Sequence, residues 1–223
     1  KLAAAAGRFE SDEIIMGAVP APYGFGLWTA HFSPAILGAP TVVLPRVDAG
    51  LALDLIERER VTVLCCVSTQ FIMLLNEQAE RPRDLSSLRS MFTGGEAVPY
   101  RRAAEFEEVT GAAVLQFYGS NETGALSNTT AADSRERRLT TAGRIIPEME
   151  VRLFDPATME EVEDSGQPAC RGPATCLGYW DDDAANAKLF TADGWMLMGD
   201  IVEVDREGYL RVVGRTSEFI IRG

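Results

Sequence analysis

One short stretch of this 223-residue sequence, "FYGSNETG", groups residues that are suited to holding a nucleotide. Tyr118 offers a flat ring on which a purine can stack, and Ser120 and Asn121 can hydrogen-bond phosphate oxygens. Gly119 lets the backbone turn sharply and approach a ligand closely, while Glu122 supplies carboxylate oxygens of the kind that Mg²⁺ prefers. In isolation, the same pattern would also fit a tyrosine packed in a core and a solvated loop acid.

Two later segments carry single groups that would complete such a site. "DGWMLMGD" ends in Asp200, whose carboxylate could accept hydrogen bonds from both hydroxyls of a ribose. "YLRVVGRTSEF" places Arg215 directly after Gly214. Either residue alone could simply belong to an ordinary turn. They indicate a nucleotide site only because they occur together with the tyrosine stretch.

Hydrophobic patterning in the first half of the chain alternates between strands and helices. This alternation implies right-handed crossovers and a parallel sheet with helices on both faces. Ligands of such sheets bind outside the carboxyl ends of the strands. The glycine-containing loops "TGGEAVP" and "FYGSNETG" follow the fourth and fifth predicted strands, where a binding site is expected. We predict strands at 13–19, 41–45, 61–67, 88–95 and 113–119, and helices at 51–60, 69–80 and 100–111.

The pattern changes in the second half of the chain. The polar stretch 131–140 is expected to be a connector. Short strand-like runs follow at 149–155, 202–205 and 209–214, divided by turn signals and by one helix-like piece at 181–190. The second half is therefore predicted to be a smaller antiparallel β subdomain.

Composition limits the classes of partner. The formal net charge of -12 disfavours nucleic acid and anionic membrane as main partners, and no apolar run is long enough for stable membrane insertion. The four cysteines form no Cys-x-x-Cys pair, and His31 alone cannot complete a zinc site. We expect a cytoplasmic protein with reduced thiols. Thiol catalysis at Cys65 or Cys66 is not expected, because both lie in a strand predicted to be buried.

The motifs, in this order and at these separations, resemble those of the adenylate-forming superfamily: acyl- and aryl-CoA ligases, adenylation domains of peptide synthetases, and luciferases. "FYGSNETG" is similar to the Tyr-Gly-x-Thr-Glu motif, and "TGGEAVP" to the glycine-rich loop beside adenine. "RGPATCLGYW" resembles an Arg-Gly-(five residues)-Gly-Tyr element, "GWMLMGD" resembles Gly-Trp-x-x-Thr-Gly-Asp, and "VGRTSEFIIRG" resembles Gly-Arg-x-x-Asp-x-Ile. The resemblance spans the whole chain and is strongest to bacterial acyl-CoA synthetases of the fatty-acid and cyclohexanecarboxylate type.

The resemblance implies an α/β fold with a flavodoxin-like parallel sheet, followed by a smaller antiparallel β-barrel-like subdomain. The implied boundaries are 1–134 for the flavodoxin-like subdomain, 135–217 for the β subdomain and 218–223 for a hinge. It further implies an internal portion of a longer enzyme. The family's phosphate loop would lie before Lys1, and its domain with the catalytic lysine would follow Gly223.

The resemblance also implies a role for each candidate residue. Tyr118 would stack on adenine, and Asp200 and Arg215 would bind the ribose. Glu122 would hold Mg²⁺ beside the ATP phosphates, and Asn121 stands where the family has a threonine that contacts the α-phosphate. The candidate catalytic residues are Glu122 and Asn121, the candidate metal ligand is Glu122, and the candidate nucleotide-binding residues are Gly94, Gly95, Glu96, Tyr118, Gly119, Ser120, Asn121, Asp200 and Arg215.

Several positions depart from the family pattern. Tyr23 occupies the place of a histidine near the substrate carboxylate, and Met198 replaces the threonine of Thr-Gly-Asp. Gln167 follows Gly166 where the family has Gly-Glu, and Glu218 replaces the hinge aspartate. Together these changes are consistent with reduced activity, an unusual substrate or a divergent paralogue.

The expected function is the middle portion of an ATP-dependent enzyme that forms an acyl-adenylate and transfers the acyl group to coenzyme A. Its implied ligands are ATP or AMP, Mg²⁺, coenzyme A and a small-molecule carboxylic acid, and the isolated segment is expected to be inactive. Two alternatives remain open. The first is a non-catalytic nucleotide-binding or scaffold relative, and the second is a ligase whose acceptor is a carrier-protein thiol. The sequence does not fix the oligomeric state.

Overall fold

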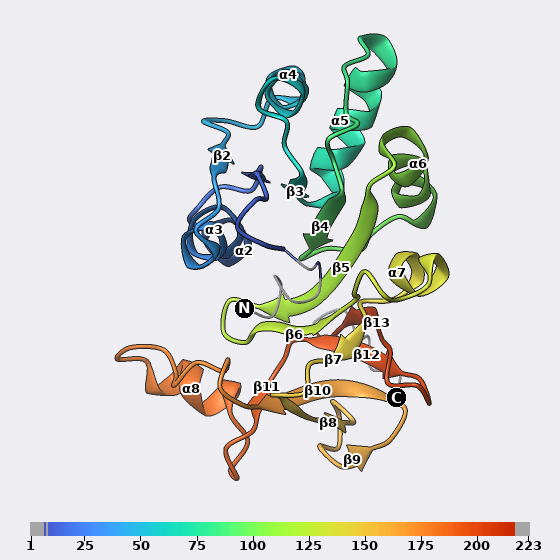
Figure 1. Ribbon diagram of the computed structural model, residues 1–223. Coiled ribbons are helices and arrows are strands. Elements are labelled where there is room, and N and C mark those ends of the chain that lie inside the picture. Colours follow the sequence, from blue (N-terminus) through green and yellow to red (C-terminus); the bar gives the residue numbers. More distant parts are fainter. Residues whose placement is uncertain (1–6, 8, 217–223) are drawn as a thin grey trace. The chain divides into compact units, whose positions relative to one another are not determined.

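The computed structural model describes residue 7 and residues 9–216, which divide into two compact units (Figure 1). The first unit holds the described residues up to Phe117 together with Asn128–Thr140, and the second holds Tyr118–Ser127 and the described residues from Thr141 onwards. The predicted hinge at 218–223, including Glu218, lies outside the described residues. Among the described residues, no helix is both long and apolar enough to cross a membrane.

The first unit is built on a parallel sheet, which confirms the five strands predicted from the sequence. Neighbouring strands pair in parallel in the order β2-β1-β3-β4-β5. β1, β3 and β4 are buried along their whole length, as expected for a parallel sheet covered on both faces. The strands are β1 (Ile15–Gly17), β2 (Thr41–Val43), β3 (Val63–Cys65), β4 (Ser90–Gly94) and β5 (Ala113–Ser120), the last of which continues into the second unit.

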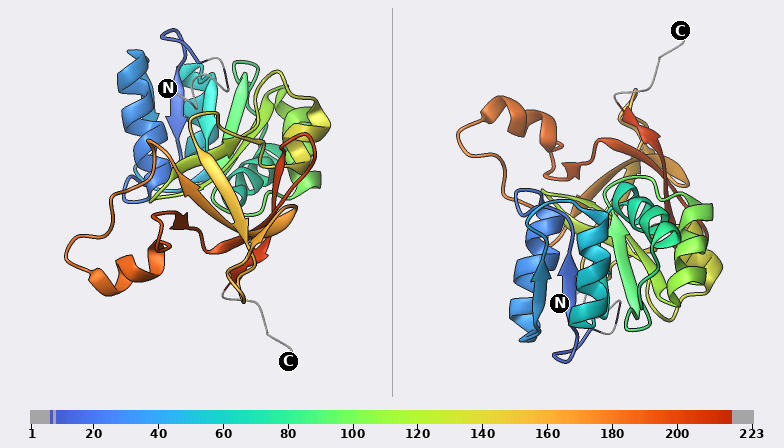
Figure 2. Two further views of the ribbon diagram at one scale, coloured as in Figure 1. Left: turned by 90° about the horizontal axis from the view of Figure 1, so that it is seen from below. Right: turned by 90° about the horizontal axis from the view of Figure 1, so that it is seen from above.

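Helices cover both faces of this sheet (Figure 2). Met16, Leu64 and Met91 pack with α4, α5 and α6 on one face. Their strand neighbours Ile15 and Phe92 pack on the other face with side chains from α2 and α3. The helical segments of this unit are α2 (Gly24–Leu27), η1 (Trp28–Phe32), α3 (Ser33–Leu37), α4 (Ala49–Glu59), α5 (Ser68–Glu80), α6 (Tyr100–Thr110) and α7 (Arg135–Thr140).

Three of these helices, α4, α5 and α6, confirm the predicted helices at 51–60, 69–80 and 100–111. The α2–α3 segment lies between the first two strands, and α7 occupies part of the stretch expected to be a connector. α7 is held by ion pairs and not by a buried face: Arg135 and Arg138 both pair with Glu107 of α6, and only Leu139 is buried. A pattern of apolar residues could therefore not reveal it.

The second unit contains the end of β5, followed by β6 and β7 as neighbouring strands, and a separate antiparallel sheet in the order β13-β12-β10-β8-β9, with β11 paired to β10. The strand-like runs at 149–155, 202–205 and 209–214 are confirmed, as is the helix at 181–190. The bounds are β6 (Gly124–Asn128), β7 (Arg144–Ile145), β8 (Glu150–Phe154), β9 (Glu161–Val162), β10 (Ser165–Arg171), α8 (Asp183–Leu189), β11 (Met196–Leu197), β12 (Asp200–Val204) and β13 (Leu210–Arg215).

β10 is the central strand that the sequence did not predict. Its sequence, "SGQPACR", contains glycine and proline, which normally indicate a turn. It nevertheless pairs with β8, β11 and β12, and its Ala169 and Cys170 are fully buried. Tertiary pairing therefore overrides the local preference of this segment.

Candidate nucleotide site

Three of the candidate residues form one hydrogen-bonded group in the second unit. The Tyr118 hydroxyl at the end of β5 donates to Asp200 Oδ2 over 3.0 Å. Arg215 Nε lies 3.4 Å from Asp200 Oδ1, because the two residues are register partners on β13 and β12. The structure thus brings together a ring, an acid and a guanidinium that are separated by up to 97 residues in the chain.

The surroundings of Tyr118, Asp200 and Arg215 determine whether Tyr118 is protonated and which of the three side chains a ligand can reach. The Tyr118 side chain is almost buried, with 7% exposed, and burial followed by the charge of Asp200 raises the pKa of Tyr118 well above its ordinary value. The phenol therefore stays a hydrogen-bond donor at neutral pH. Asp200 is 19% exposed and Arg215 is 65% exposed, so both can still reach a ligand. Stacking of Tyr118 on adenine remains a prediction, whereas its hydroxyl holds Asp200.

The turn after β5 is preformed by its own side chains. The Ser120 hydroxyl accepts from the backbone N–H groups of Glu122, at 3.1 Å, and Thr123, at 3.2 Å. Thr123 Oγ1 in turn accepts from the Ser120 N–H over 2.9 Å. Gly119 is required by packing, since a Cβ at this position would overlap the carbonyl oxygen of Gly124. Asn121 is exposed on this turn.

Glu122 is held at both its backbone and its carboxylate. Its carbonyl oxygen accepts from the Cys176 N–H at 2.7 Å, and its Oε1 accepts from the Tyr179 hydroxyl at 2.9 Å. Burial would raise the pKa of Glu122, but hydrogen bonds from Ser120 and Tyr179 outweigh it, and the net effect lowers the pKa. The carboxylate is therefore charged at neutral pH.

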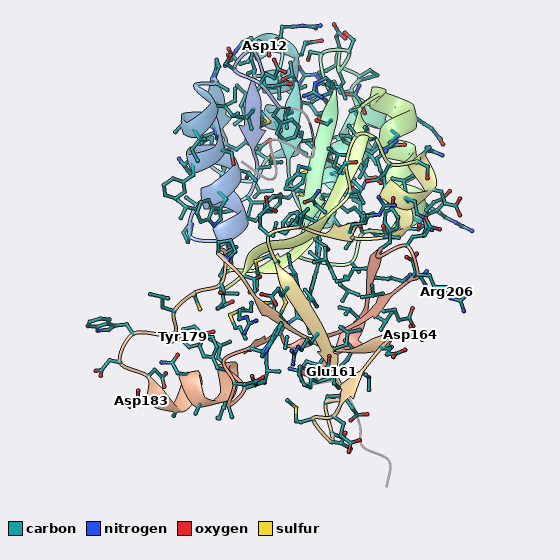
Figure 3. The ribbon with its side chains drawn as sticks, turned by 60° about the horizontal axis from the view of Figure 1, so that its bottom comes forward. Asp12, Glu161, Asp164, Tyr179, Asp183 and Arg206 are labelled. Atoms are coloured by element: carbon teal, nitrogen blue, oxygen red, sulfur yellow. The ribbon has the colours of Figure 1, made fainter. Side chains whose placement is uncertain are left out.

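Two residues of this arrangement, Tyr179 and Asn186, were not predicted as site residues. Tyr179 lies on the loop that leads to α8 (Figure 3). Its N–H donates to Asn186 Oδ1 at 2.7 Å, and its carbonyl oxygen accepts from Asn186 Nδ2 at 2.9 Å. The Gly-Tyr pair of the "RGPATCLGYW" motif was a signal for Tyr179, but nothing in the sequence indicated Asn186.

The glycine-rich loop candidates Gly94, Gly95 and Glu96 lie in the first unit, whereas Tyr118, Asp200 and Arg215 lie in the second. Gly94 ends β4, where a Cβ would lie 2.5 Å from the Phe117 carbonyl oxygen. Gly95 has a φ of +82°, which favours glycine. Glu96 Oε1 accepts from the Thr69 N–H at 3.0 Å and so contacts the first turn of α5.

The donor set around Glu122 fits a nucleotide-bound Mg²⁺ better than an ion held by protein ligands alone. Within the described residues, no group of three or more His, Cys, Asp or Glu side chains could hold a metal ion. Mg²⁺ commonly takes one or two carboxylates and completes its shell with water and substrate phosphates. A single charged carboxylate, fixed at its backbone as Glu122 is, satisfies that requirement.

The structure does not support thiol catalysis at Cys65, the last residue of β3, or at the adjacent Cys66. Burial raises the pKa of Cys65 to about 12 and that of Cys66 well above its ordinary value, so both thiols are protonated at pH 8. Burial also raises the pKa of Cys170 to about 12, whereas Cys176 is only half-buried.

We expect iodoacetamide at pH 8 to modify Cys176 in the native protein and to leave the other three cysteines unmodified, because alkylation requires an accessible thiolate. Peptide mass spectrometry after timed labelling measures this, and labelling in urea should modify all four cysteines. Rapid native labelling of Cys65 or Cys66 would contradict the burial of these residues.

A model of the family described as "AMP-binding enzyme" matches residues 2–180. The match covers well over half of the chain, so the chain belongs to the AMP-binding enzyme family. This confirms the resemblance to the adenylate-forming ligases that the motifs indicated.

Individual relatives agree with this family. The indoleacetate–CoA ligase of Aromatoleum aromaticum is 35% identical over 97% of this chain and 42% of its own length. Pyochelin synthase PchD of Pseudomonas aeruginosa is 36% identical over 96% of this chain and 40% of its own length. The structure of the Bacillus subtilis O-succinylbenzoate coenzyme A synthetase MenE, in complex with ATP and magnesium ion, superposes with a TM-score of 0.80 at 29% identity, covering 95% of this chain and 43% of that chain. The chain thus spans about two fifths of the length of its relatives.

Proposed function

We propose that this chain is the nucleotide-binding part of an ATP-dependent acid–thiol ligase that forms an acyl-adenylate and transfers the acyl group to coenzyme A. The observation that carries the proposal is the hydrogen-bonded group of Tyr118, Asp200 and Arg215. Two relatives, a CoA ligase and a coenzyme A synthetase, support the choice of acceptor by their names. ATP and coenzyme A are cytoplasmic metabolites, and the free cysteines fit that compartment.

Asp200 is proposed to bind the ribose of the nucleotide. Tyr118 and Arg215 engage one carboxylate oxygen each, but a carboxylate has about four lone-pair sites and can still accept two hydroxyl groups. The Tyr118 hydrogen bond and the strand pairing keep the carboxylate in one orientation before the ribose arrives. Arg215, which is exposed, is proposed to contact the ribose from the β13 side.

The turn after β5 is proposed to hold the phosphates. Asn121 can donate its amide N–H to phosphate oxygens, Ser120 is proposed to line the same turn, and Glu122 would hold Mg²⁺ beside them. When bound, Mg²⁺ would offset the repulsion between the substrate carboxylate and the triphosphate. Gly94, Gly95 and Glu96 are proposed as further nucleotide-binding residues, supplied by the first unit.

The proposed reaction has two steps. A carboxylate oxygen of the substrate attacks the α-phosphorus of ATP, the bond to the β-phosphate oxygen breaks, and pyrophosphate leaves. The thiol of coenzyme A, having lost its proton, then attacks the acyl carbon of the adenylate and displaces AMP. The first step brings two anions together, so fixed donors around the phosphates are its main requirement.

Hydroxylamine trapping with a panel of carboxylic acids tests the proposal. The complete product of the gene should give hydroxamates and ATP–pyrophosphate exchange, whereas the 223-residue chain alone should give neither. Nucleotide binding without exchange in the complete product would favour a non-catalytic relative. Acyl transfer to a phosphopantetheinyl carrier but not to coenzyme A would instead identify a carrier-protein ligase.

Replacement of Asp200 by asparagine should weaken AMP binding roughly 10- to 100-fold, since a hydrogen bond to a charged group contributes about 1.5–3 kcal/mol. Asparagine keeps an oxygen that can accept from Tyr118, so the fold should be retained. Isothermal titration calorimetry on the complete protein measures the affinity, with Asp164→Asn, an exposed acid of the same unit, as the control (Figure 3). Unchanged affinity in Asp200→Asn would remove the ribose assignment.

A further inference from the structure

Two segments of the second unit that are far apart in the sequence meet at Glu122. The segment that follows β10 donates the Cys176 N–H to the Glu122 carbonyl oxygen at 2.7 Å. The same segment donates the Tyr179 hydroxyl to Glu122 Oε1 at 2.9 Å, across 57 residues of sequence. The backbone and the carboxylate of Glu122 are therefore both held from one loop.

This loop is not held by burial of its own apolar side chains. Leu177 and Trp180 are fully exposed, at 103% and 98%, and Tyr179 is 43% exposed. Polar contacts must therefore hold the loop in place. A tyrosine loses rotamer freedom when it is fixed to make a single hydrogen bond, so further contacts are needed to offset that cost. Tyr179 is kept in place by its contacts to Glu122 and to Asn186.

The Asn186 side chain makes two hydrogen bonds to the Tyr179 backbone: its Oδ1 accepts from the Tyr179 N–H at 2.7 Å, and its Nδ2 donates to the Tyr179 carbonyl oxygen at 2.9 Å. Gly178 makes this approach possible: its φ is +133°, and a Cβ there would lie 2.8 Å from Asn186 Oδ1. Asn186 itself sits on α8, whose N-cap Asp182 accepts from the Ala185 N–H at 2.9 Å. α8 has no buried residue, so core packing does not account for its presence.

We propose that Tyr179 and Asn186 are positioning residues that fix the Glu122 carboxylate for Mg²⁺, so that α8 and its loop set the affinity for the metal–nucleotide complex. This inference rests on the proposed function, in which Glu122 holds the ion. Metal-binding carboxylates are themselves oriented by hydrogen-bond donors, and loss of such a donor typically weakens metal binding about 10- to 100-fold.

Mn²⁺ binding in the presence of ATP, followed by electron paramagnetic resonance on the complete protein, tests this proposal. Tyr179→Phe should weaken Mn²⁺ binding about 10- to 100-fold. Asn186→Ala should weaken it too, and Asn186→Asp, which retains the acceptor for the Tyr179 N–H, should restore part of the loss. With EDTA present to remove metal ions, the affinity for AMP should be unchanged in all three variants. Unchanged AMP binding also shows that the variants are folded. Tyr100→Phe, at an exposed tyrosine of the first unit, is the matched control.

A double-mutant cycle separates positioning from a general structural effect. In a Glu122→Gln background, Tyr179→Phe should cause no further loss of Mn²⁺ affinity, because the group it orients no longer binds the ion. If Glu122→Gln weakens Mn²⁺ binding but Tyr179→Phe does not, the positioning role is wrong and the proposed function stands. If Glu122→Gln leaves Mn²⁺ binding unchanged, the metal assignment fails and this inference fails with it.

Discussion

Replacement of Glu122 by glutamine should lower the rate of ATP–pyrophosphate exchange by roughly 10²- to 10³-fold, comparable to the loss of one fixed electrostatic group in other active sites. Glutamine has nearly the same shape and keeps an oxygen that can accept from Tyr179, so the turn should stay intact. What it removes is the negative charge that would hold Mg²⁺. Exchange of labelled pyrophosphate into ATP, measured on the complete protein, gives the rate.

The matched control for this variant is Glu163→Gln, at an exposed glutamate of the same unit. It should exchange at the wild-type rate. Wild-type exchange in Glu122→Gln, with the control also unchanged, would show that this carboxylate does not contribute to adenylate formation.

Among the described glycines of the second unit, Gly119 should be the one whose replacement by alanine is most destabilising. The added Cβ would overlap the carbonyl oxygen of Gly124, and a backbone atom cannot move aside without opening the β5–β6 turn. Overpacking of a tight site typically costs about 1–3 kcal/mol, and a backbone clash belongs at or above the upper end of that range. We therefore expect the melting temperature to fall by roughly 6–12 °C.

Thermal unfolding followed by circular dichroism measures this shift. The control is Gly214→Ala on β13, where an added Cβ would meet no atom within 4 Å, and its melting temperature should change little. Equal stability of the two variants would mean that the β5–β6 turn can open at low cost.

The parallel sheet could be predicted because each of its strands is a short apolar run bounded by turn residues. β3 is an example: Val63, Leu64 and Cys65 are all buried, and no local preference competes with the strand. The α2–α3 segment gives a weaker sequence signal for the opposite reason. It contains two glycines and Pro34, and its large side chains Trp28 and Phe32 stay about half exposed, so its apolar residues do not mark out one buried face.

The candidate site residues could be predicted from family motifs but not from the spacing of residues along the chain. Tyr118 and Asp200 are 82 residues apart, and no periodicity predicts that their side chains hydrogen-bond. Asn186 could not be found at all, since its role consists of contacts to the backbone of Tyr179. Backbone partners leave no residue-type signal in a single sequence.

Two of the departures from the family pattern contact each other in the second unit. Gln167 Nε2 donates to the Met198 carbonyl oxygen at 2.6 Å, and the Met198 N–H donates to the Pro168 carbonyl oxygen at 2.8 Å. Met198 is 4% exposed and lies two residues before Asp200. A glutamine and a methionine thus join β10 to the segment that leads into Asp200, so these two changes are compatible with an ordered segment at the proposed ribose site.

The division of the chain has a consequence for how the protein can be made and cut. Because the units exchange segments at 117/118, 127/128 and 140/141, no single cleavage separates them. During synthesis, residues 118–127 of the second unit leave the ribosome before α7 completes the first. A continuous stretch that contains all of the first unit, residues 1–140, must therefore also carry 118–127 of the second, and one that contains all of the second, residues 118–223, must also carry 128–140 of the first.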